Sequence, residues 1–183
     1  MGAMPRNRPD VAREEKIDDI VRVAARALRE GGYEALSLSG VAQELGLARG
    51  AIYWYFASKD DLLVAAAKRI FDEALSSPPS LGQYAKRIEW AMEQLAMLGQ
   101  VTSALRDRSH HSEAVASFET AFHRRLCDGL RNVLRPNVPA ARLDDVADSV
   151  VVFVQGLLSM GLAPAVRRDR LKFLLRQLVP RVS

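Results

Sequence analysis

The sequence contains a single cysteine, Cys127, among its 183 residues. One cysteine excludes a disulfide framework within the chain and is typical of a reducing cytoplasm. No N-terminal apolar stretch resembles a signal peptide, and the most apolar segment, 150–163, is too short to span a bilayer. About half of the residues are apolar, which is enough for a core without disulfides or metal. We therefore expect a cytoplasmic protein with no membrane partner.

Motifs for catalysis and for cofactors are also missing. The chain has no Gly-x-Ser-x-Gly nucleophile setting and no glycine-rich phosphate loop. His110 and His111 are adjacent and would diverge on a helix, and neither they nor His123 suggest a metal site, so solvated histidines are expected. Cys127 has no strong base or lysine beside it and is expected to be a buried, inert thiol. We expect no enzyme activity, no metal and no cofactor.

Strand patterns are scarce, whereas apolar residues recur at helical spacing along most of the chain. Ile17, Ile20, Ala24 and Leu28 give a first apolar face, with Asp10 as a candidate cap and Gly31-Gly32 as the stop. Further helices are predicted over 37–45, 49–56, 58–75, 84–98, 115–133, 144–162 and 167–179. Ser58 is the expected N-cap of the 58–75 helix, with Asp in place of Glu in the capping box. The pattern predicts an all-α protein.

The net charge of +4 and the pI of about 9.5 suggest a nucleic acid or another anionic partner. Residues 1–58, however, hold eight basic and eight acidic residues. Any positive surface in that stretch must come from the placement of charges. An N-terminal arm carrying Arg6 and Arg8 could touch a minor groove, although a disordered tail is the simpler alternative.

Two short helices separated by a tight turn are predicted between residues 37 and 56. Ser37 is a natural N-cap for the first helix, and Gly46 ends it. Only Leu47 and Ala48 separate it from the second helix, Arg49 to Phe56. This is the spacing of a helix-turn-helix, whose second helix enters the DNA major groove.

Four of the twelve aromatic residues stand side by side at 53–56, as Tyr-Trp-Tyr-Phe. One helix face cannot bury all four, so a plain core cluster is the weaker alternative. Ile52 and Phe56, with Ala48, are expected to face inward, and the other residues to face a partner. Arg49 could contact a base edge or a phosphate, or be a solvated surface residue, and Ser37 could act as a cap alone. The predicted DNA-binding set is Ser37, Ser39, Arg49, Gly50, Ala51, Tyr53, Trp54, Tyr55 and Lys59.

The stretch "GGYEALSLSGVAQELGLARGAIYWYFASKDDLL" resembles the DNA-binding module of the TetR family of bacterial transcription regulators. The resemblance covers about residues 14–70 and rests on a series of spaced positions. These are Gly32-Tyr33, Ser37, Val41-Ala42, Gly46-Leu47, the run from Ile52 to Phe56, Ser58-Lys59-Asp60 and Leu62. Two positions depart from the pattern. Ala48 replaces the frequent Ser or Thr cap, and Gly40 leaves the capping box at Ser37 incomplete, which costs helix-end stability rather than function.

The resemblance implies an all-helical homodimer of about nine helices, with three N-terminal helices for DNA, a ligand-sensing body and a four-helix dimer interface. We divide the chain into a flexible tail (1–12, with 1–3 as a cloning remnant), a DNA-binding domain (13–73) and a ligand-binding and dimerisation domain (80–183). Helices near 144–162 and 167–179 are expected to form the homodimer, and the dimer to bind a palindromic double-stranded DNA operator.

A small-molecule effector is expected to bind in the C-terminal body and release the repressor from its operator. The candidate lining is Trp90, Met97, Phe118, Phe122, Phe153 and Gln155, an apolar set with one polar group, although ordinary core is the simpler interpretation of each. Two alternatives stay open. One is a helical module that binds protein instead of DNA, and the other is an all-helical enzyme without a visible catalytic constellation.

Overall fold

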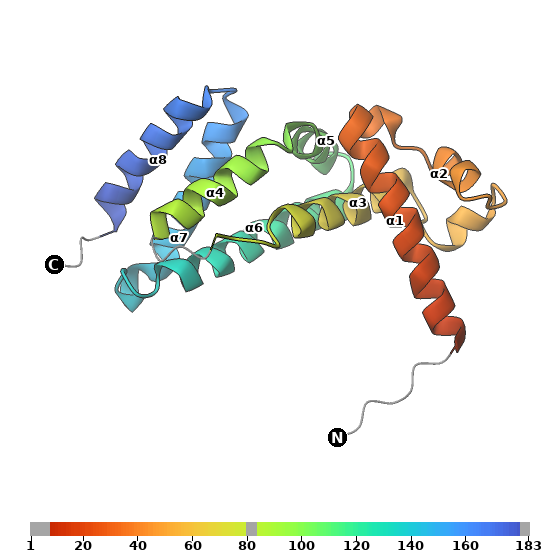
Figure 1. Ribbon diagram of the computed structural model, residues 1–183, viewed down its shortest axis with the longest axis horizontal. Coiled ribbons are helices and arrows are strands. Elements are labelled where there is room, and N and C mark those ends of the chain that lie inside the picture. Colours follow the sequence, from red (N-terminus) through yellow and green to blue (C-terminus); the bar gives the residue numbers. More distant parts are fainter. Residues whose placement is uncertain (1–7, 80–83, 180–183) are drawn as a thin grey trace, which may run out of the picture. The chain divides into compact units, whose positions relative to one another are not determined.

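The computed structural model describes residues 8–79 and 84–179, and all secondary structure in these ranges is helical (Figure 1). The eight α-helices and one short 3-10 helix in these ranges confirm the predicted all-α fold of about nine helices. They are α1 (Arg8–Ala35), α2 (Leu38–Glu44), η1 (Ala51–Trp54), α3 (Lys59–Ala74), α4 (Tyr84–Ala96), α5 (Gly99–Ser109), α6 (Glu113–Leu134), α7 (Ala140–Ser159) and α8 (Pro164–Leu178).

The described residues fall into two compact units. The first comprises 8–72 together with 100–116, and the second comprises 73–79, 84–99 and 117–179. The predicted ligand-binding and dimerisation domain spans 80–183, whereas 100–116 packs with the first unit. Arg108 on α5 bonds to Asp60 on α3, and Val101 and Leu105 are buried, so α5 belongs to the first unit.

Helix α1 begins at Arg8, so the predicted tail over 1–12 is wrong for residues 8–12, and Asp10 is not its cap. The predictions for residues 1–7, including the Arg6 arm and the cloning remnant, lie outside the described residues, as does the side chain of Arg8. Gly32 has φ 65°, in the region that favours glycine, and Gly31 and Gly32 interrupt the helix as expected. Residues 33–35 then continue as a short helical connector.

Helix α2 is held by the predicted cap. The backbone N–H of Gly40 donates to Ser37 Oγ over 3.3 Å. Gly46, with φ 64°, turns the chain out of the helix. Val41 and Ala42 are buried against the core of the first unit. The first half of the predicted helix-turn-helix is therefore present.

The second half is shorter than predicted. Instead of an α-helix over Arg49–Phe56, the chain forms a 3-10 helix over Ala51–Trp54. No side chain caps it, and its bonds span mostly three residues, such as Tyr53 N–H to the Gly50 carbonyl (3.3 Å). Ile52 is fully buried and Phe56 nearly so, as predicted, whereas Ala48 is exposed and not inward. An uncapped start and a four-residue length favour the tighter helix.

The start of α3 matches its predicted capping pattern. The backbone N–H of Asp61 donates to Ser58 Oγ over 3.0 Å, and the Ser58 hydroxyl donates to Asp61 Oδ2 over 2.7 Å. This reciprocal pair fixes the first turn of α3 directly after the aromatic run.

In the second unit, α4, α7 and α8 pack against one another, and α6 adds Cys127, Leu130 and Leu134 to the same core. Arg167 on α8 ties α8 to α4 by donating to Glu93 Oε2 over 3.0 Å. Helix α7 buries Val146, Val150, Val154 and Leu157 but leaves Val152 54% exposed. Within the described residues no helix combines the length and apolarity needed to cross a bilayer.

Helix α5 is not among the helices predicted from the sequence. Only Val101, Ala104 and Leu105 of this helix are buried, which is too short a stripe to stand out from its polar surroundings. The polar residues around these three obscure the helical period.

Replacing Ile52 with Ala is expected to lower the free energy of unfolding by about 3 kcal/mol, because it leaves a cavity beneath η1. Urea denaturation followed by circular dichroism would measure the loss. Val11→Ala, at a position 37% exposed, is the control and should change stability little. Equal stabilities of the two variants would contradict the anchoring role of Ile52.

Candidate functional site

Two large aromatic side chains project from η1 into solvent. Tyr53 is 57% exposed and Trp54 is 83% exposed, directly after the fully buried Ile52. An indole that gains almost no burial within its own chain is unusual, since aromatic rings are normally among the best-buried groups. The exposed pair indicates a contact surface.

The residues before this pair are small or basic. Arg49 and Gly50 are exposed, and Ala51 and Tyr55 are half-buried. A Cβ added at Gly50 would meet nothing within 4 Å, so packing in the chain itself does not require glycine there. The small side chains at positions 50 and 51 leave the backbone open to approach by a large partner.

Ser37 and Ser39 lie at the start of α2, with their hydroxyl oxygens 3.0 Å apart. Both residues are half-buried. Ser37 already accepts the Gly40 N–H, so its capping role is shown, and a phosphate contact would be additional.

Lys59, at the start of α3, is held over an aromatic ring. Its Nζ lies 3.9 Å from the centroid of the Tyr33 ring. The Tyr33 hydroxyl donates to Asp60 Oδ1 over 2.8 Å, and Arg108 donates to Asp60 through Nε (3.1 Å) and Nη2 (2.8 Å). We call Tyr33, Lys59, Asp60 and Arg108 the Asp60 cluster. It joins α1, α3 and α5 within the first unit.

The cluster shifts the pKa values of its members. The Arg108 hydrogen bonds, helped by the Tyr33 hydroxyl, hold the pKa of the Asp60 carboxyl below its usual range despite partial burial. Burial, followed by the hydrogen bond to Asp60, raises the pKa of Tyr33 to about 12. Asp60 is therefore ionised and Tyr33 neutral at physiological pH. Sequence reasoning missed Arg108, which is 48 residues from Asp60 and stands in no motif.

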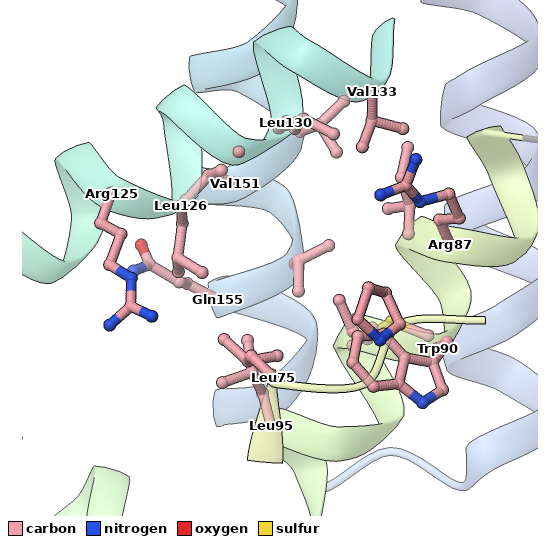
Figure 2. Close-up of a pocket in the computed structure, with 17 residues that line it drawn as sticks. Leu75, Arg87, Trp90, Leu95, Arg125, Leu126, Leu130, Val133, Val151 and Gln155 are labelled. Carbon is pink, nitrogen blue, oxygen red and sulfur yellow. The ribbon is translucent and has the colours of Figure 1, made fainter. Parts of the chain in front are cut away.

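A cavity of 270 Å³ lies in the second unit (Figure 2). Figure 2 shows Arg87 and Trp90 of α4 on one side of it, and Arg125 and Leu126 of α6 with Gln155 on the other. The rest of the wall is almost entirely apolar and includes Leu75, Leu95 and Val151. Trp90 and Gln155 are thus brought together, as the predicted lining requires.

The other four residues of the predicted lining lie elsewhere. Met97 is 70% exposed. Phe118 and Phe122 stack on each other, with ring centroids 5.9 Å apart, and do not line the cavity. Phe153 packs, partly buried, against the core of the second unit. The sequence indicates the period of each helix but not its rotation, so it did not show which faces border this cavity.

Sequence reasoning also missed residues that line the cavity. Arg87 and Arg125 stand on exposed faces of amphipathic helices and gave no signal, and Gly129 looked like an ordinary helix residue. Cys127 is buried, and burial, with the nearby Asp148 carboxylate, raises the pKa of its thiol. The expected burial of Cys127 is thus confirmed, whereas its lack of reactivity stays a prediction.

A capped short helix, a glycine turn and a second short helix with outward aromatics define a helix-turn-helix protein. Residues 20–66 match the family model described as "Bacterial regulatory proteins, tetR family". Over these residues the chain is therefore similar to bacterial regulatory proteins of the tetR family.

Three similar proteins illustrate the relationship. The chain is 28% identical over 111 residues, 57% of its length, to the fatty acid metabolism regulator protein of Bacillus subtilis (strain 168). It is 29% identical over 126 residues, 65% of its length, to the transcriptional repressor KstR of Rhodococcus jostii (strain RHA1). The matches span 52% and 59% of those two proteins, little more than half of their length.

The third similar protein is known from its structure. The crystal structure of BioQ with its natural double-stranded DNA operator shares the fold, with a TM-score of 0.64 and 24% identity. The match covers 88% of this chain and 96% of that chain.

Replacing Asp60 with Asn is expected to lower the free energy of unfolding at neutral pH by about 2 kcal/mol, because charge-assisted hydrogen bonds are lost. The folded-state pKa of Asp60 lies below 3.8, so its contribution is present above that pH and disappears as the pH falls through the folded-state value. The difference between wild type and variant should therefore shrink in acid, as measured by urea denaturation across pH.

Asp72→Asn is the control for this series, since Asp72 forms an exposed pair with Lys68 over 2.7 Å. Such pairs contribute little, so this variant should differ little from wild type at any pH. If Asp60→Asn lowers the free energy of unfolding by the same amount at every pH, including the most acidic, the result would contradict a stabilising role for the ionised Asp60 carboxylate.

Proposed function

We propose that the protein is a cytoplasmic, DNA-binding transcriptional repressor that binds a palindromic operator as a homodimer and is released by a small apolar effector. The observation that carries the proposal is the exposure of Tyr53 and Trp54 on a short helix whose Ile52 is fully buried. The names of the similar proteins, one of them a repressor and another solved with its operator, support the same function.

The DNA contacts follow from the positions of the side chains. The aromatic rings of Tyr53 and Trp54 and the Tyr55 hydroxyl would lie along the sugar-phosphate backbone, where they position the protein. Arg49 precedes η1 and would read a base edge, since bidentate contact with guanine is the commonest specific use of arginine. Lys59, fixed over Tyr33, would contact a phosphate together with Ser37 and Ser39.

The dimer proposal rests on apolar side chains left exposed by α7 and α8. Val152 on α7 is 54% exposed and Met160, just after α7, is 68% exposed; Phe173 on α8 is 59% exposed. These positions fall on the two helices expected to form the interface. A second copy of the chain would cover them by a twofold contact, and a twofold dimer matches a palindromic operator.

The cavity suggests the chemical class of the effector. Its wall is apolar except for Arg87, Arg125 and Gln155, so an apolar body with one anionic group fits best. Its 270 Å³ is small for a ligand site, since such sites usually measure about 300–1,000 Å³. We propose a small aliphatic carboxylate, a class consistent with the name of the Bacillus relative, the fatty acid metabolism regulator protein.

Release from DNA requires that the effector bind one conformation of the dimer better than the other. Helices α3 and α6 each contain residues of both units, so they are continuous connections between the cavity and the first unit. A shift of either helix on effector binding would change the distance between the two copies of residues 49–56 in the dimer.

Binding to a palindromic DNA from the protein's own promoter should weaken steeply as salt rises, because each phosphate contact releases counterions. Tyr53→Ala and Lys59→Ala should each weaken binding to every sequence, but only Lys59→Ala, which removes a positive charge, should reduce the salt slope by about one contact. Arg49→Ala should reduce discrimination between bases by about 1–3 kcal/mol. Fluorescence anisotropy titrations across salt would measure all three.

Arg135→Ala, an exposed cation in the second unit, is the matched control and should bind DNA like wild type. Salt-insensitive binding, or three site variants with wild-type affinity, would favour the alternative of a protein-binding module.

Filling the cavity should abolish the response to the effector. A Cβ at Gly129 meets nothing within 4 Å, so Gly129→Leu can place its side chain in the open space of the cavity without disturbing α6. Affinity for octanoate or decanoate should fall by about tenfold or more, since a single methylene already changes binding by 1–3 kcal/mol. Isothermal titration calorimetry measures the change.

Met97→Ala is the control, because Met97 is exposed and does not line the cavity. Unchanged carboxylate binding in Gly129→Leu, or loss of binding in Met97→Ala, would show that the effector binds elsewhere.

A further inference from the structure

Three side chains with metal-binding atoms converge in the second unit, outside both sites described above. His123 Nε2 lies 2.9 Å from Asp148 Oδ1 and 3.5 Å from Cys127 Sγ, and Cys127 Sγ lies 3.9 Å from Asp148 Oδ1. His123 and Cys127 are four residues apart on α6 and therefore share a face. Asp148 of α7 completes the group, so the arrangement depends on the packing of the two helices.

The separations match those in a tetrahedral zinc centre. Zinc binds histidine nitrogen at about 2.0–2.1 Å, thiolate sulfur at about 2.3 Å and carboxylate oxygen at about 2.0–2.2 Å. Tetrahedral angles then place neighbouring ligand atoms about 3.3–3.7 Å apart. The three observed distances, 2.9, 3.5 and 3.9 Å, lie within about half an ångström of this range. An ion would need only small side-chain adjustments.

We propose that His123, Cys127 and Asp148 form a zinc-binding site whose fourth position is open to water or to an exogenous ligand. The donor set decides the class of metal. A thiolate and an imidazole favour zinc over magnesium or calcium, which prefer oxygen ligands. Among the described residues, this is the group of histidine, cysteine and acidic side chains whose donor atoms lie within 4.8 Å of one another.

The burial of the three ligands gives the ion a route of entry. The side chain of Asp148 is 62% exposed and that of His123 is 32% exposed, whereas Cys127 is buried at 4%. The ion would approach from solvent and meet the thiol at the back of the site. The nearby cation, Arg131, is paired with Asp128 and Asp144, which reduces its repulsion of a metal ion.

The competing interpretation is a hydrogen-bonded tie between α6 and α7 without an ion. It explains the His123–Asp148 contact and leaves the sulfur as a core side chain with only weak hydrogen bonds, at 3.5 Å and 3.9 Å. Both interpretations predict some loss of stability when a member is replaced. Only the zinc site predicts stoichiometric binding of metal through the thiolate.

The test uses the full chain after removal of metal with a chelator. Titration with Co²⁺, a spectroscopic substitute for zinc, should give one ion per chain and a thiolate-to-cobalt charge-transfer band, and zinc should displace the cobalt. Cys127→Ser should lose the band. His123→Ala and Asp148→Asn each remove a ligand atom and should each weaken zinc binding by more than about tenfold. Loss of a residue that only hydrogen-bonds to a metal ligand can already weaken binding by about tenfold.

Two controls share the helix or the residue type without belonging to the group. Asp145→Asn, also exposed on α7, and His111→Ala should bind metal like wild type. Because Asp148 is exposed, Asp148→Asn should fold normally, so the test does not depend on the buried cysteine alone. A wild type without the cobalt-thiolate band, or ligand variants with wild-type zinc affinity, would overturn the proposal, and neither result bears on DNA binding.

Discussion

The exposed side chains of Arg49, Tyr53 and Trp54 form what we call the candidate reading surface. This surface depends on the burial of Ile52 and Phe56. These two side chains anchor the stretch between α2 and α3 to the core of the first unit. With both ends of the aromatic run fixed inward, the short helix between them must turn Tyr53 and Trp54 outward. A longer α-helix would rotate these residues by 100° per position and distribute them differently. The 3-10 geometry, which the sequence did not predict, is therefore part of how the surface is made.

The Asp60 cluster supports this surface from behind. Ser58 and Asp61 fix the first turn of α3, and Asp60 is tied to α1 and α5 through Tyr33 and Arg108. The same arrangement holds Lys59 over the Tyr33 ring, which limits the rotamers of a side chain that would otherwise move freely. A pre-ordered lysine loses less entropy when it meets a phosphate. The first unit is thus stiffened where it would contact DNA.

Local features of the fold followed from the sequence, and features that depend on packing did not. The Ser37 and Ser58 caps, the glycine turn at 46 and the inward Ile52 rest on neighbouring residues, and all were predicted correctly. The wall of the cavity depends on the rotation of α4, α6 and α7, and only Trp90 and Gln155 of the six candidates line it. Contacts between distant segments, such as Arg108 with Asp60, leave no mark in a local pattern.

Charge placement explains how a neutral module could bind a polyanion. Several acids of residues 1–72 are paired within the unit, including Asp60 with Arg108, Glu44 with Arg26 and Asp18 with Arg69. The stretch 47–57 contains no acid, and Arg49 there is exposed and forms no ion pair among the described residues. Because screening limits each charge to about 10 Å at moderate salt, the local arrangement outweighs the net charge of the domain. Pairing the acids away from 47–57 would therefore leave the candidate reading surface positive without a basic sequence.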